Sequence, residues 1–317
     1  MGEKTDRKNI TIKDVARAAG TSVTTVSRVL SGSGYPVKKE LKERILKVAK
    51  ERGYKPQGGA GMGAIKTFRA GKLNVKIYET RKELGESAAW EMAGELKRLL
   101  ETEDEVNIIF AAAPSQNEFL EHLTKIEGIE WNRVNAFHMD EYIGLNPDAP
   151  QRFGNFLRER IFDKVGFRSV SYIDGNAENP REESARYANL LKKHPPHIVC
   201  MGIGENGHIA FNDPHVALFD DPELVKIVEL DEKCRQQQVN DGCFGKIEEV
   251  PKYALTLTIP MLLSAKTIYC MVPGKTKTQA VTRTVTGEIT QDCPASILKT
   301  HANATLYVDK DSGAGIL

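Results

Sequence analysis

The sequence predicts a small all-α domain in residues 1–57, followed by a larger α/β domain built around a largely parallel sheet. Three observations predict this organisation. The first segment is basic and the remainder is acidic. Helical periods fill the first segment, and strand-like apolar runs alternate with helical periods in the second. A chain of 317 residues is long enough for one large domain or two.

Composition narrows the class of protein further. With 40% hydrophobic and 27% charged residues, the chain is typical of a globular protein and unlike a disordered chain or a coiled-coil rod. No apolar stretch approaches the roughly 18 residues of a membrane span, and MGEKTDRKNI lacks the apolar core of a signal peptide. The five cysteines show no CxxC spacing. We therefore expect reduced thiols, no metal site and a cytoplasmic location.

The net charge of +1 conceals an asymmetry. Residues 1–57 carry 14 Lys and Arg against 6 Asp and Glu, a net charge of +8. The rest of the chain carries 30 against 37, a net charge of −7. Such an asymmetry indicates a nucleic-acid-binding module joined to another domain, or else a solvated basic tail.

The pattern of residues 1–57 predicts three short helices. Ser22 is a good N-cap for the second of them, and Gly20 ends the first. The third runs from about Val37 to Arg52. The expected inward-facing residues are, in turn, Ile12, Val15, Ala16 and Ala19; Val23, Val26, Val29 and Leu30; Leu41, Ile45, Val48 and Ala49. Two short helices joined by a tight turn and supported by a third form a helix-turn-helix.

The stretch TIKDVARAAGTSVTTVSRVLSG, followed by ERGYKP, resembles the DNA-binding domain of the lac-repressor family. The resemblance implies that the second helix enters the major groove of a double-stranded DNA operator. The residues it assigns to base edges are Val23, Thr24 and Arg28, and those it assigns to phosphates are Ser22, Thr25 and Ser27. Arginine pairs bidentately with guanine, and hydroxyls at a helix N-terminus suit phosphate. Three solvated helices of unrelated use are the alternative.

The segment after this domain departs from the family. Lac-repressor relatives continue with a short hinge helix whose leucine enters the minor groove. Here the chain reads QGGAGMG, with four glycines in seven residues. Glycine-rich segments are flexible. We therefore expect a linker over residues 58–72 and no minor-groove wedge, with the larger domain spanning 73–317.

The larger domain contains apolar runs that read as strands: LNVKIYET, VNIIFAA, VNAFHMDE, HIVCMGIG, YALTLTI, TIYCMVP and ATLYVD. Helical periods separate several of them, as in the helix with Leu84, Ala88, Met92, Leu96 and Leu99 on one face. Apolar strands alternating with helices predict a parallel sheet. Ligands of such sheets bind beyond the carboxyl ends of the strands.

Polar clusters follow three of these runs. Asp140 and Glu141 lie at the end of VNAFHMDE. This pair predicts either a proton-transfer base with a structural neighbour or a cap for the following loop. In GIGENGHIAFNDP, His208 precedes Asp213 by five residues, which predicts an acid–base pair or a structural histidine. Lys275 and Lys277 lie at the start of a predicted helix, where they indicate either an anion-binding site or a pair of solvated lysines.

The segments FHMDEYIGL, GENGHIAFNDP and PKYALTLTIPMLL occur in this order, and residues 73–317 resemble the glucosamine-6-phosphate deaminase/isomerase family. The resemblance implies a Rossmann-like sugar-phosphate isomerase fold. It also implies conversion of glucosamine 6-phosphate to fructose 6-phosphate and ammonia without a metal or organic cofactor. HIAFN and MDEY favour this branch over the related 6-phosphogluconolactonases.

The resemblance also assigns roles. Asp140 would move a proton between C2 and C1, and His208, supported by Asp213, would open the sugar ring. Lys277 would hold the phosphate, and Gly207 would allow close approach of the backbone to the ligand. These roles suit the chemistry, because ring opening needs a proton shuttle and an enediol intermediate needs a base that reaches both carbons.

Several positions depart from the family pattern. Asn206 stands where the family commonly has aspartate, and Asp213 stands where it has glutamate. AAAPSQNE replaces the Gly-Ser-Thr phosphate loop, so Ser115 and Gln116 become the expected phosphate contacts there. Gln238 aligns with a phosphate-binding arginine, and Arg235 is a candidate replacement. These changes together indicate a subfamily with its own substrate.

Two functions remain open from the sequence. One is a transcriptional regulator whose deaminase-like domain senses an amino-sugar or ketose phosphate. The other is a deaminase that carries an accessory DNA-binding head. Because helix-turn-helix proteins generally read two half-sites, we expect a homo-oligomer that is at least a dimer.

Overall fold

The computed structural model describes residues 10–30, 37–52 and 63–317, without the side chains of Ser27 and Arg28. The chain divides into two compact units, residues 1–63 and 64–317. Each unit is described by itself.

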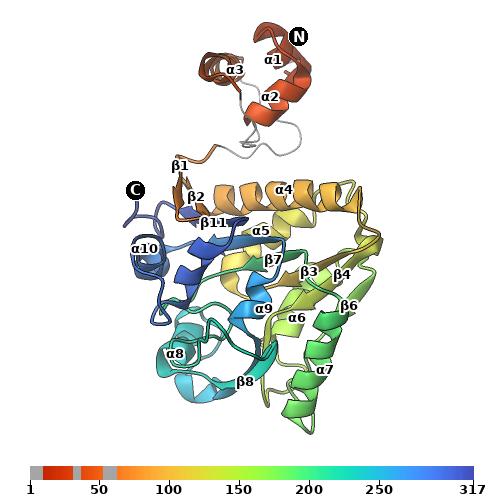
Figure 1. Cartoon of the computed structure of the whole chain (residues 1–317), viewed down its shortest axis with the longest axis vertical. Coiled ribbons are helices and arrows are strands. Elements are labelled where there is room, and N and C mark those ends of the chain that lie inside the picture. Colours follow the sequence, from red (N-terminus) through yellow and green to blue (C-terminus); the bar gives the residue numbers. More distant parts are fainter. Residues whose placement is uncertain (1–9, 31–36, 53–62) are drawn as a thin grey trace, which may run out of the picture. The chain divides into compact units, whose positions relative to one another are not determined.

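The first unit contains three helices: α1 (Ile12–Ala18), α2 (Val23–Leu30) and α3 (Lys39–Glu51) (Figure 1). The expected N-cap is present, because Ser22 Oγ accepts a hydrogen bond of 3.1 Å from the backbone N–H of Thr25. Val15, Val26 and Ile45, one from each helix, are fully buried against one another. The prediction of an inward-facing Val23 is wrong, since its side chain is 40% exposed.

The second unit is built on an eight-stranded sheet (Figure 1) with the order β1-β2-β11-β10-β7-β3-β4-β6. All neighbouring strands are parallel except β1 and β2. The strands are β1 (Lys66–Ala70), β2 (Leu73–Tyr78), β3 (Val106–Phe110), β4 (Val134–His138), β6 (Ser169–Ser171), β7 (Ile198–Met201), β10 (Thr267–Val272) and β11 (Ala304–Asp309). The α/β class and the largely parallel sheet are therefore as predicted.

The structure changes the expected start of the larger domain. The sequence placed residues 58–72 in a linker, but β1 pairs antiparallel with β2, from Lys66 opposite Ile77 to Ala70 opposite Leu73. Residues 66–70 belong to the sheet because a turn at Gly71 returns the chain onto β2, and Gly71 adopts a φ of +60° that favours glycine. The predicted absence of a hinge helix concerns residues that lie outside the described part of the chain.

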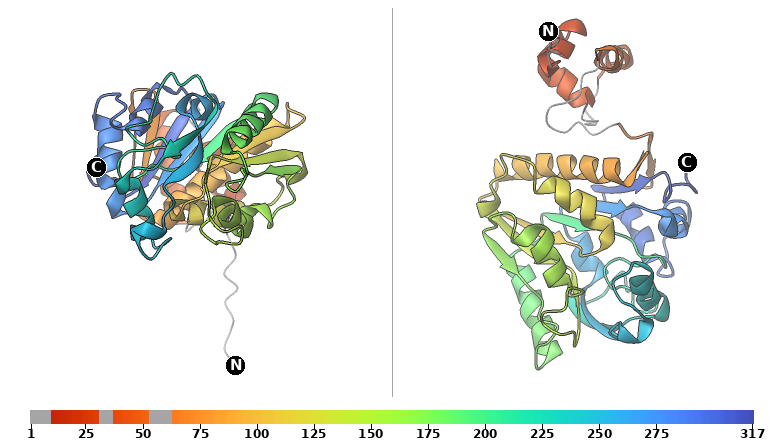
Figure 2. Two further views of the ribbon diagram at one scale, coloured as in Figure 1. Left: turned by 90° about the horizontal axis from the view of Figure 1, so that it is seen from below. Right: turned by 180° about the vertical axis from the view of Figure 1, so that it is seen from behind.

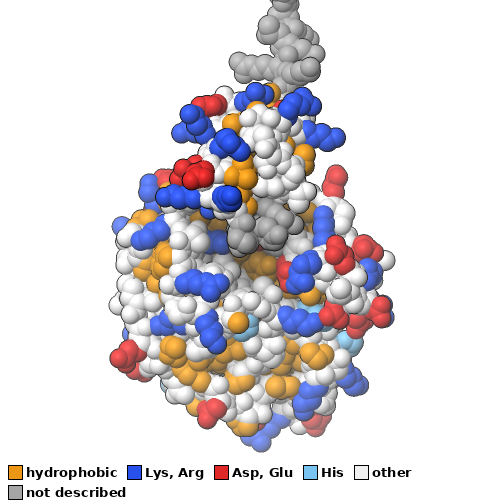
Figure 3. All heavy atoms as spheres, turned by 45° about the horizontal axis from the view of Figure 1, so that its top comes forward, with side chains coloured by type: hydrophobic (Ala, Val, Ile, Leu, Met, Phe, Trp, Pro, Cys, Tyr) orange, Lys and Arg blue, Asp and Glu red, His pale blue; other side chains and the backbone are white. Residues whose placement is uncertain are grey.

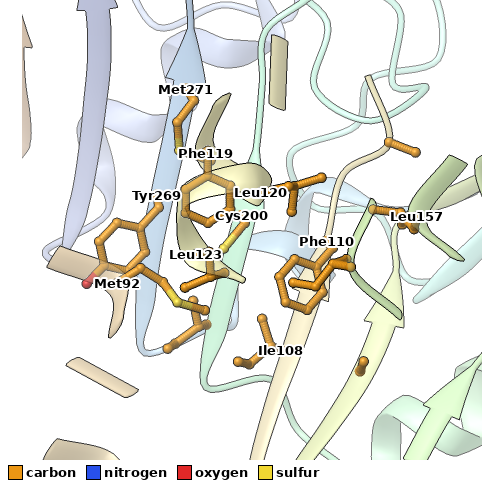
Figure 4. Packing of buried hydrophobic residues seen from close by; sticks show 14 of the residues in the cluster. Met92, Ile108, Phe110, Phe119, Leu120, Leu123, Leu157, Cys200, Tyr269 and Met271 are labelled. Atoms are coloured by element: carbon orange, nitrogen blue, oxygen red, sulfur yellow. The ribbon is translucent and has the colours of Figure 1, made fainter. Parts of the chain in front are cut away.

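Helices cover both faces of the main sheet (Figures 1 and 2). One face packs against α4 (Arg81–Leu100), α5 (Asn117–Leu123) and α6 (Phe153–Leu157), the last continuing as a π-helical turn (Arg158–Phe162). The other packs against α7 (Pro180–Lys193), α9 (Ile259–Leu263), α10 (Thr278–Thr286) and the 3-10 segment Pro294–Thr300. The expected inward face of α4 is buried throughout. Figure 4 shows Met92 of α4 and Phe119 of α5 packing near Ile108 and Phe110 of β3.

A second, three-stranded antiparallel sheet consists of β5 (Asp140–Tyr142), β9 (Tyr253–Leu257) and β8 (Val225–Glu229), with β9 in the centre. The helix α8 (Glu232–Asn240) follows β8. The run VNAFHMDE was expected to be one strand, but it divides between β4 of the main sheet and β5 of the second sheet. Asp140 therefore lies at the point where the chain passes from one sheet to the other.

A helix long and apolar enough to cross a membrane is not found among the described residues.

Candidate active site

A cavity of about 260 Å³ lies beyond the carboxyl ends of the central parallel strands. Its walls come largely from the segments that follow four of them: residues 111–115 after β3, 139–140 after β4, 202–204 after β7 and 273–277 after β10. Ligands of parallel α/β sheets bind at this edge, as predicted from the sequence. The three polar clusters of the sequence analysis each contribute a side chain to it.

Asp140 lines the cavity, although its side chain is only 6% exposed. Burial, followed by repulsion from Glu141, raises the pKa of the Asp140 carboxyl well above its ordinary value. Within the described residues the carboxyl group accepts no hydrogen bond. An unpaired, desolvated carboxylate is a strong base, so this side chain is suited to proton transfer.

The neighbouring carboxylate, Glu141, has a structural role. It accepts hydrogen bonds from the backbone N–H groups of Tyr142, Phe153 and Gly154, at 2.9 to 3.1 Å. Glu141 therefore caps the start of α6. Of the two alternatives that the sequence left for the Asp140-Glu141 pair, the geometry supports a cavity-facing Asp140 with a structural neighbour.

His138 fixes the backbone at Asp140. Its Nε2 accepts from the N–H of Ile173 at 2.9 Å, so Nδ1 carries the proton and donates to the carbonyl of Asp140, also at 2.9 Å. Burial lowers the pKa of His138 to about 4, which keeps the ring neutral and in this tautomer. The hydroxyl of Tyr187 bridges the backbone N–H and carbonyl of His138.

The contact between His208 and Asp213 that the sequence predicted is formed. His208 Nδ1 lies 3.1 Å from Asp213 Oδ1 and 2.8 Å from Asn206 Oδ1, and the His208 ring lines the cavity. Burial opposes ionisation of Asp213, but hydrogen bonds from His208, Asn206 and the N–H of Asp231 outweigh it and lower the pKa of Asp213. The shorter aspartate thus reaches the imidazole, with both oxygens held.

Asn206 connects this pair to a second carboxylate. Its amide nitrogen donates to Asp213 Oδ1 at 2.9 Å and to Asp231 Oδ2 at 3.1 Å, while its oxygen faces His208. An aspartate at this position would place three carboxylates together. The neutral amide instead donates to both acids, so the substitution is compatible with a charged Asp213.

Two backbone features hold the imidazole against the cavity wall. A Cβ on Gly204 would lie 2.1 Å from the His208 ring, so only glycine leaves room for it. Ala210 has a φ of +48°, an unfavourable conformation for a residue with a side chain, and it also lines the cavity. Strained backbone at such a position is typical of functional sites.

A buried cation also lines the cavity. Lys277 is 5% exposed, and its ammonium forms no hydrogen bond or ion pair with any residue that the structure describes. Burial lowers the pKa of its ammonium, whereas Asp241, Glu205 and Cys234 act in the opposite direction. Ser115 and Lys275 line the cavity as well. An unpaired buried ammonium is a natural site for an anionic group of a ligand.

Three residues expected near the ligand lie elsewhere. Arg235 donates to the carbonyls of Ile247 and Val250 and does not line the cavity. Gln116 is 1% exposed beneath the cavity floor. Gly207 faces Cys293, to which a Cβ would approach within 2.9 Å, and its φ of +92° requires glycine. None of these three residues lines the cavity.

Other lining residues were not anticipated. The unpredicted side chains include Arg81, Phe153, Phe211, Gln237 and Asp241, while Gln238, discussed above as standing where the family has an arginine, is among the lining residues. Arg81 forms an ion pair with Glu118 and donates to the carbonyl of Pro114. Its position in the first turn of α4, directly after β2, was the available signal, since this turn lies at the carboxyl edge of a parallel strand.

The donor atoms of His208, Asp213 and Cys234 lie within 4.8 Å of one another, which is a geometry a transition metal can use. Metal binding there requires a thiolate and a free imidazole nitrogen. Burial raises the pKa of Cys234 well above its ordinary value, and Asp213 and Asn206 already engage the Nδ1 of His208. The donor set fits an acid–base pair better than a metal centre.

In the first unit, the expected DNA-contacting side chains lie at the exposed start of α2. Ser22, Val23 and Thr24 are exposed and Thr25 is partly buried. Ser27 and Arg28 belong to α2, but their side chains lie outside the described part of the structure. Lys and Arg side chains gather on the face of this unit that Figure 3 shows.

The larger unit is thus an α/β unit in which a buried carboxyl group, a His–Asp pair and a buried ammonium border one cavity. Residues 79–307 match the model of the glucosamine-6-phosphate isomerases/6-phosphogluconolactonases, and the chain belongs to this family. Residues 11–57 match the model of the bacterial regulatory proteins of the lacI family. A LacI-type DNA-binding region is thus fused to a glucosamine-6-phosphate deaminase-like domain.

Similar proteins agree with this assignment. A glucosamine-6-phosphate deaminase of an Exiguobacterium species is 36% identical over 185 residues, covering 58% of this chain and 71% of that protein. A glucosamine-6-phosphate deaminase of Bacillus cereus is 31% identical over 240 residues, covering 76% and 88%.

Solved structures share the fold. A structure described as a monomeric glucosamine-6-phosphate deaminase matches with a TM-score of 0.70 and 29% identity, covering 76% of this chain and 99% of that one. The 6-phosphogluconolactonase of Thermotoga maritima matches with a TM-score of 0.61 and 18% identity, covering 74% and 99%. The latter likeness shows the fold alone.

Proposed function

We propose that this protein is a transcriptional regulator that binds an operator through residues 11–57 and binds an amino-sugar phosphate, such as glucosamine 6-phosphate, in the cavity of its larger unit. The observation that carries the proposal is the placement of Asp140, His208 and Lys277 on the walls of one cavity. The matches to lacI-family regulators and to deaminases support the two halves of this function.

The chemistry of the cavity suits a phosphorylated amino sugar. Lys277 offers an unpaired ammonium for the phosphate, and Ser115 lines the same cavity. His208 exchanges a proton with the ring oxygen, while Asp213 stabilises the imidazolium that forms. Asp140 takes the C2 proton and returns it to C1, and water hydrolyses the resulting imine at C2, which releases ammonia and the ketose phosphate.

The state of Asp140 bears on whether the ligand is converted. A pure sensor needs no base at C2, and an unpaired buried carboxyl is unfavourable for folding. Retention of Asp140, with His138 dedicated to fixing its backbone, supports turnover of the bound sugar phosphate. We therefore propose that the protein both senses and deaminates its ligand. The alternative is a deaminase whose DNA-binding head is accessory.

The test is ammonia release from glucosamine 6-phosphate by the full-length protein, with Asp140→Asn as the matched control. Release that disappears in the variant supports turnover with Asp140 as the base. Thermal stabilisation by the sugar phosphate without release supports a sensor. Neither release nor stabilisation contradicts the proposed ligand.

On DNA we propose at least a dimer. Helix-turn-helix units usually read two half-sites about one helical turn apart, and a two-fold operator calls for two copies. The similar deaminase described as monomeric indicates that the larger unit does not by itself require a partner. Sedimentation with and without operator DNA measures the stoichiometry, and one copy per operator contradicts the proposal.

A further inference from the structure

We infer that Gln116, which does not itself reach the cavity, is a positioning residue that orients the Ser115 hydroxyl to donate a hydrogen bond to the anionic group of the ligand. The inference rests on the proposed function and adds a specific anion-binding device to it. It begins with the burial of Gln116, whose side chain is 1% exposed while the adjacent Ser115 lines the cavity.

The amide of Gln116 has a single orientation that satisfies its surroundings. Its Nε2 lies 3.3 Å from the carbonyl oxygen of Met201, at the end of β7, and 3.3 Å from that of Met271, near the end of β10. Both neighbours are acceptors only. If the amide were turned over, its oxygen would face two carbonyl oxygens, so the nitrogen must point toward them.

This orientation determines what Ser115 does. The same Nε2 lies 3.0 Å from Ser115 Oγ and donates to it, so the serine oxygen acts as an acceptor on that side. The hydroxyl keeps its own hydrogen. Among the residues that the structure describes, no acceptor takes that hydrogen, and the side chain borders the cavity. The Ser115 hydroxyl can therefore donate a hydrogen bond to a ligand in the cavity.

Ser115 and Gln116 are tightly packed against the backbone at Gly202. A Cβ on Gly202 would lie 3.1 Å from Ser115 Oγ and 3.3 Å from Gln116 Nε2, tighter than ordinary contact. The Oε1 of Gln116 is buried without a partner in the described structure, so the amide is held by its donor side alone. Leaving an acceptor unpaired costs free energy, which the two N–H groups of Nε2, shared among three acceptors, must offset.

A donor hydroxyl and the unpaired ammonium of Lys277 in one cavity select an anionic oxygen, such as those of a phosphate monoester. The sequence predicted Gln116 as a direct phosphate contact. In the structure its contribution passes through Ser115, which explains why a buried glutamine follows the partly buried, cavity-lining serine in AAAPSQNE.

The test is a double-mutant cycle on the full-length protein, with the affinities for glucosamine 6-phosphate and for inorganic phosphate measured by calorimetry. Ser115→Ala is expected to weaken binding of both by about 10- to 100-fold, the range for a hydrogen bond to a charged group. Gln116→Met, which keeps the side-chain length but cannot donate, is expected to weaken binding by about 3- to 10-fold. The double variant should bind no more weakly than Ser115→Ala alone.

Gln291→Met, at an exposed glutamine, is the matched control and should bind like the wild type. Full additivity of Gln116→Met and Ser115→Ala overturns the inference, because a merely structural glutamine would act independently of the hydroxyl. Unchanged binding by Ser115→Ala overturns it as well, even if Gln116→Met does not fold. In that case Gly202→Ala, measured with and without Ser115→Ala, replaces it in the cycle.

Failure of the proposed function is recognised separately. If the wild-type protein binds neither glucosamine 6-phosphate nor inorganic phosphate, both the proposed function and this inference are wrong. If the wild type binds but the cycle is additive, only the role of Gln116 is wrong.

Discussion

Asp140 illustrates a conflict between stability and function at a single residue. Its carboxyl group is buried, lacks hydrogen-bond partners among the described residues and lies beside a second acid, so its pKa is raised. A group whose pKa is higher in the folded chain than in the unfolded chain stabilises the fold only while protonated. Its contribution is lost as the pH rises through the folded-state pKa. At neutral pH, which is above the unfolded-state pKa of about 4, the raised pKa therefore means that Asp140 destabilises the fold.

Asp140→Asn should consequently stabilise the protein while removing its chemistry. We expect the free energy of unfolding at pH 7 to rise by about 1 to 3 kcal/mol, since a neutral amide replaces a carboxyl group whose raised pKa disfavours folding at that pH. Deamination of glucosamine 6-phosphate should fall by about 10²- to 10⁴-fold with the loss of the base. Urea unfolding and ammonia release measure the two effects. Asp148→Asn, at an exposed aspartate, is the control, and a less stable Asp140→Asn would contradict the prediction.

Asp213 should show the opposite pH dependence. Its pKa is lowered in the folded protein, so its ionised form contributes stability above the unfolded-state pKa of about 4, and this stability is lost as the pH falls through the folded-state value. Asp213→Asn should therefore cost about 1.5 to 3 kcal/mol near pH 6 and progressively less below pH 4. Urea unfolding of both proteins between pH 3 and 7 measures this. A difference that is independent of pH would show that the charge of Asp213 is not involved.

At the residue scale, the sequence predicted several cavity-lining side chains better than those packed around them. Asp140, His208 and Lys277 lie in the segments that follow β4, β7 and β10, so topology directs them to one edge of the sheet. Arg235 and Gln116 could not be placed in this way. Arg235 turns toward the carbonyls of Ile247 and Val250 because the fold brings that distant segment against α8. No local pattern records such a contact.

At the scale of helices and loops, glycines differ in whether other atoms occupy the space that a Cβ would need. Gly94 lies in the exposed part of α4, and a Cβ there would meet no atom within 4 Å. Gly204, in the loop after β7, leaves room for the His208 ring at 2.1 Å from the position of a Cβ. The first glycine only weakens its helix, while the second shapes the site.

Substitution by alanine should therefore have opposite effects at the two positions. Gly94→Ala is expected to raise the free energy of unfolding by about 0.5 to 1 kcal/mol, because alanine restricts the unfolded chain and favours the helix. Gly204→Ala is expected to displace the imidazole, lower stability by about 1 to 3 kcal/mol and weaken binding of the sugar phosphate. Thermal unfolding and calorimetry test both. Equal effects of the two substitutions would show that contact with His208 does not determine the role of Gly204.

Elements with a strong internal pattern were predictable, and those defined by their partners were not. The seven apolar runs and α4 are clear because periodicity reflects burial. β1, which contains one lysine and one arginine, and the three-residue β6 are the edge strands of the main sheet. At these edges the pairing of strands, more than the local sequence, determines the conformation. The division of VNAFHMDE into β4 and β5 likewise depends on β9, more than 100 residues later.

For the whole molecule, the sequence predicted two units from charge and pattern, and the structure divides the chain close to the expected position. The physical reason is that each unit has its own core: Val15, Val26 and Ile45 in the first, and the two faces of the main sheet in the second. A regulator built from two such units requires that ligand binding in one change the affinity of the other for DNA.

Thermodynamic linkage makes that requirement testable. If a bound sugar phosphate changes the affinity for operator DNA by some factor, bound DNA must change the affinity for the sugar phosphate by the same factor, typically about 5- to 150-fold in allosteric proteins. We expect this reciprocity in the Asp140→Asn protein, in which the ligand is not consumed. Fluorescence anisotropy of labelled operator and calorimetry of the sugar phosphate, at one fixed salt concentration because DNA affinity falls steeply with salt, measure the two factors. A factor of one in both directions would mean that the units bind independently, and the enzyme with an accessory DNA-binding head would then be the correct function.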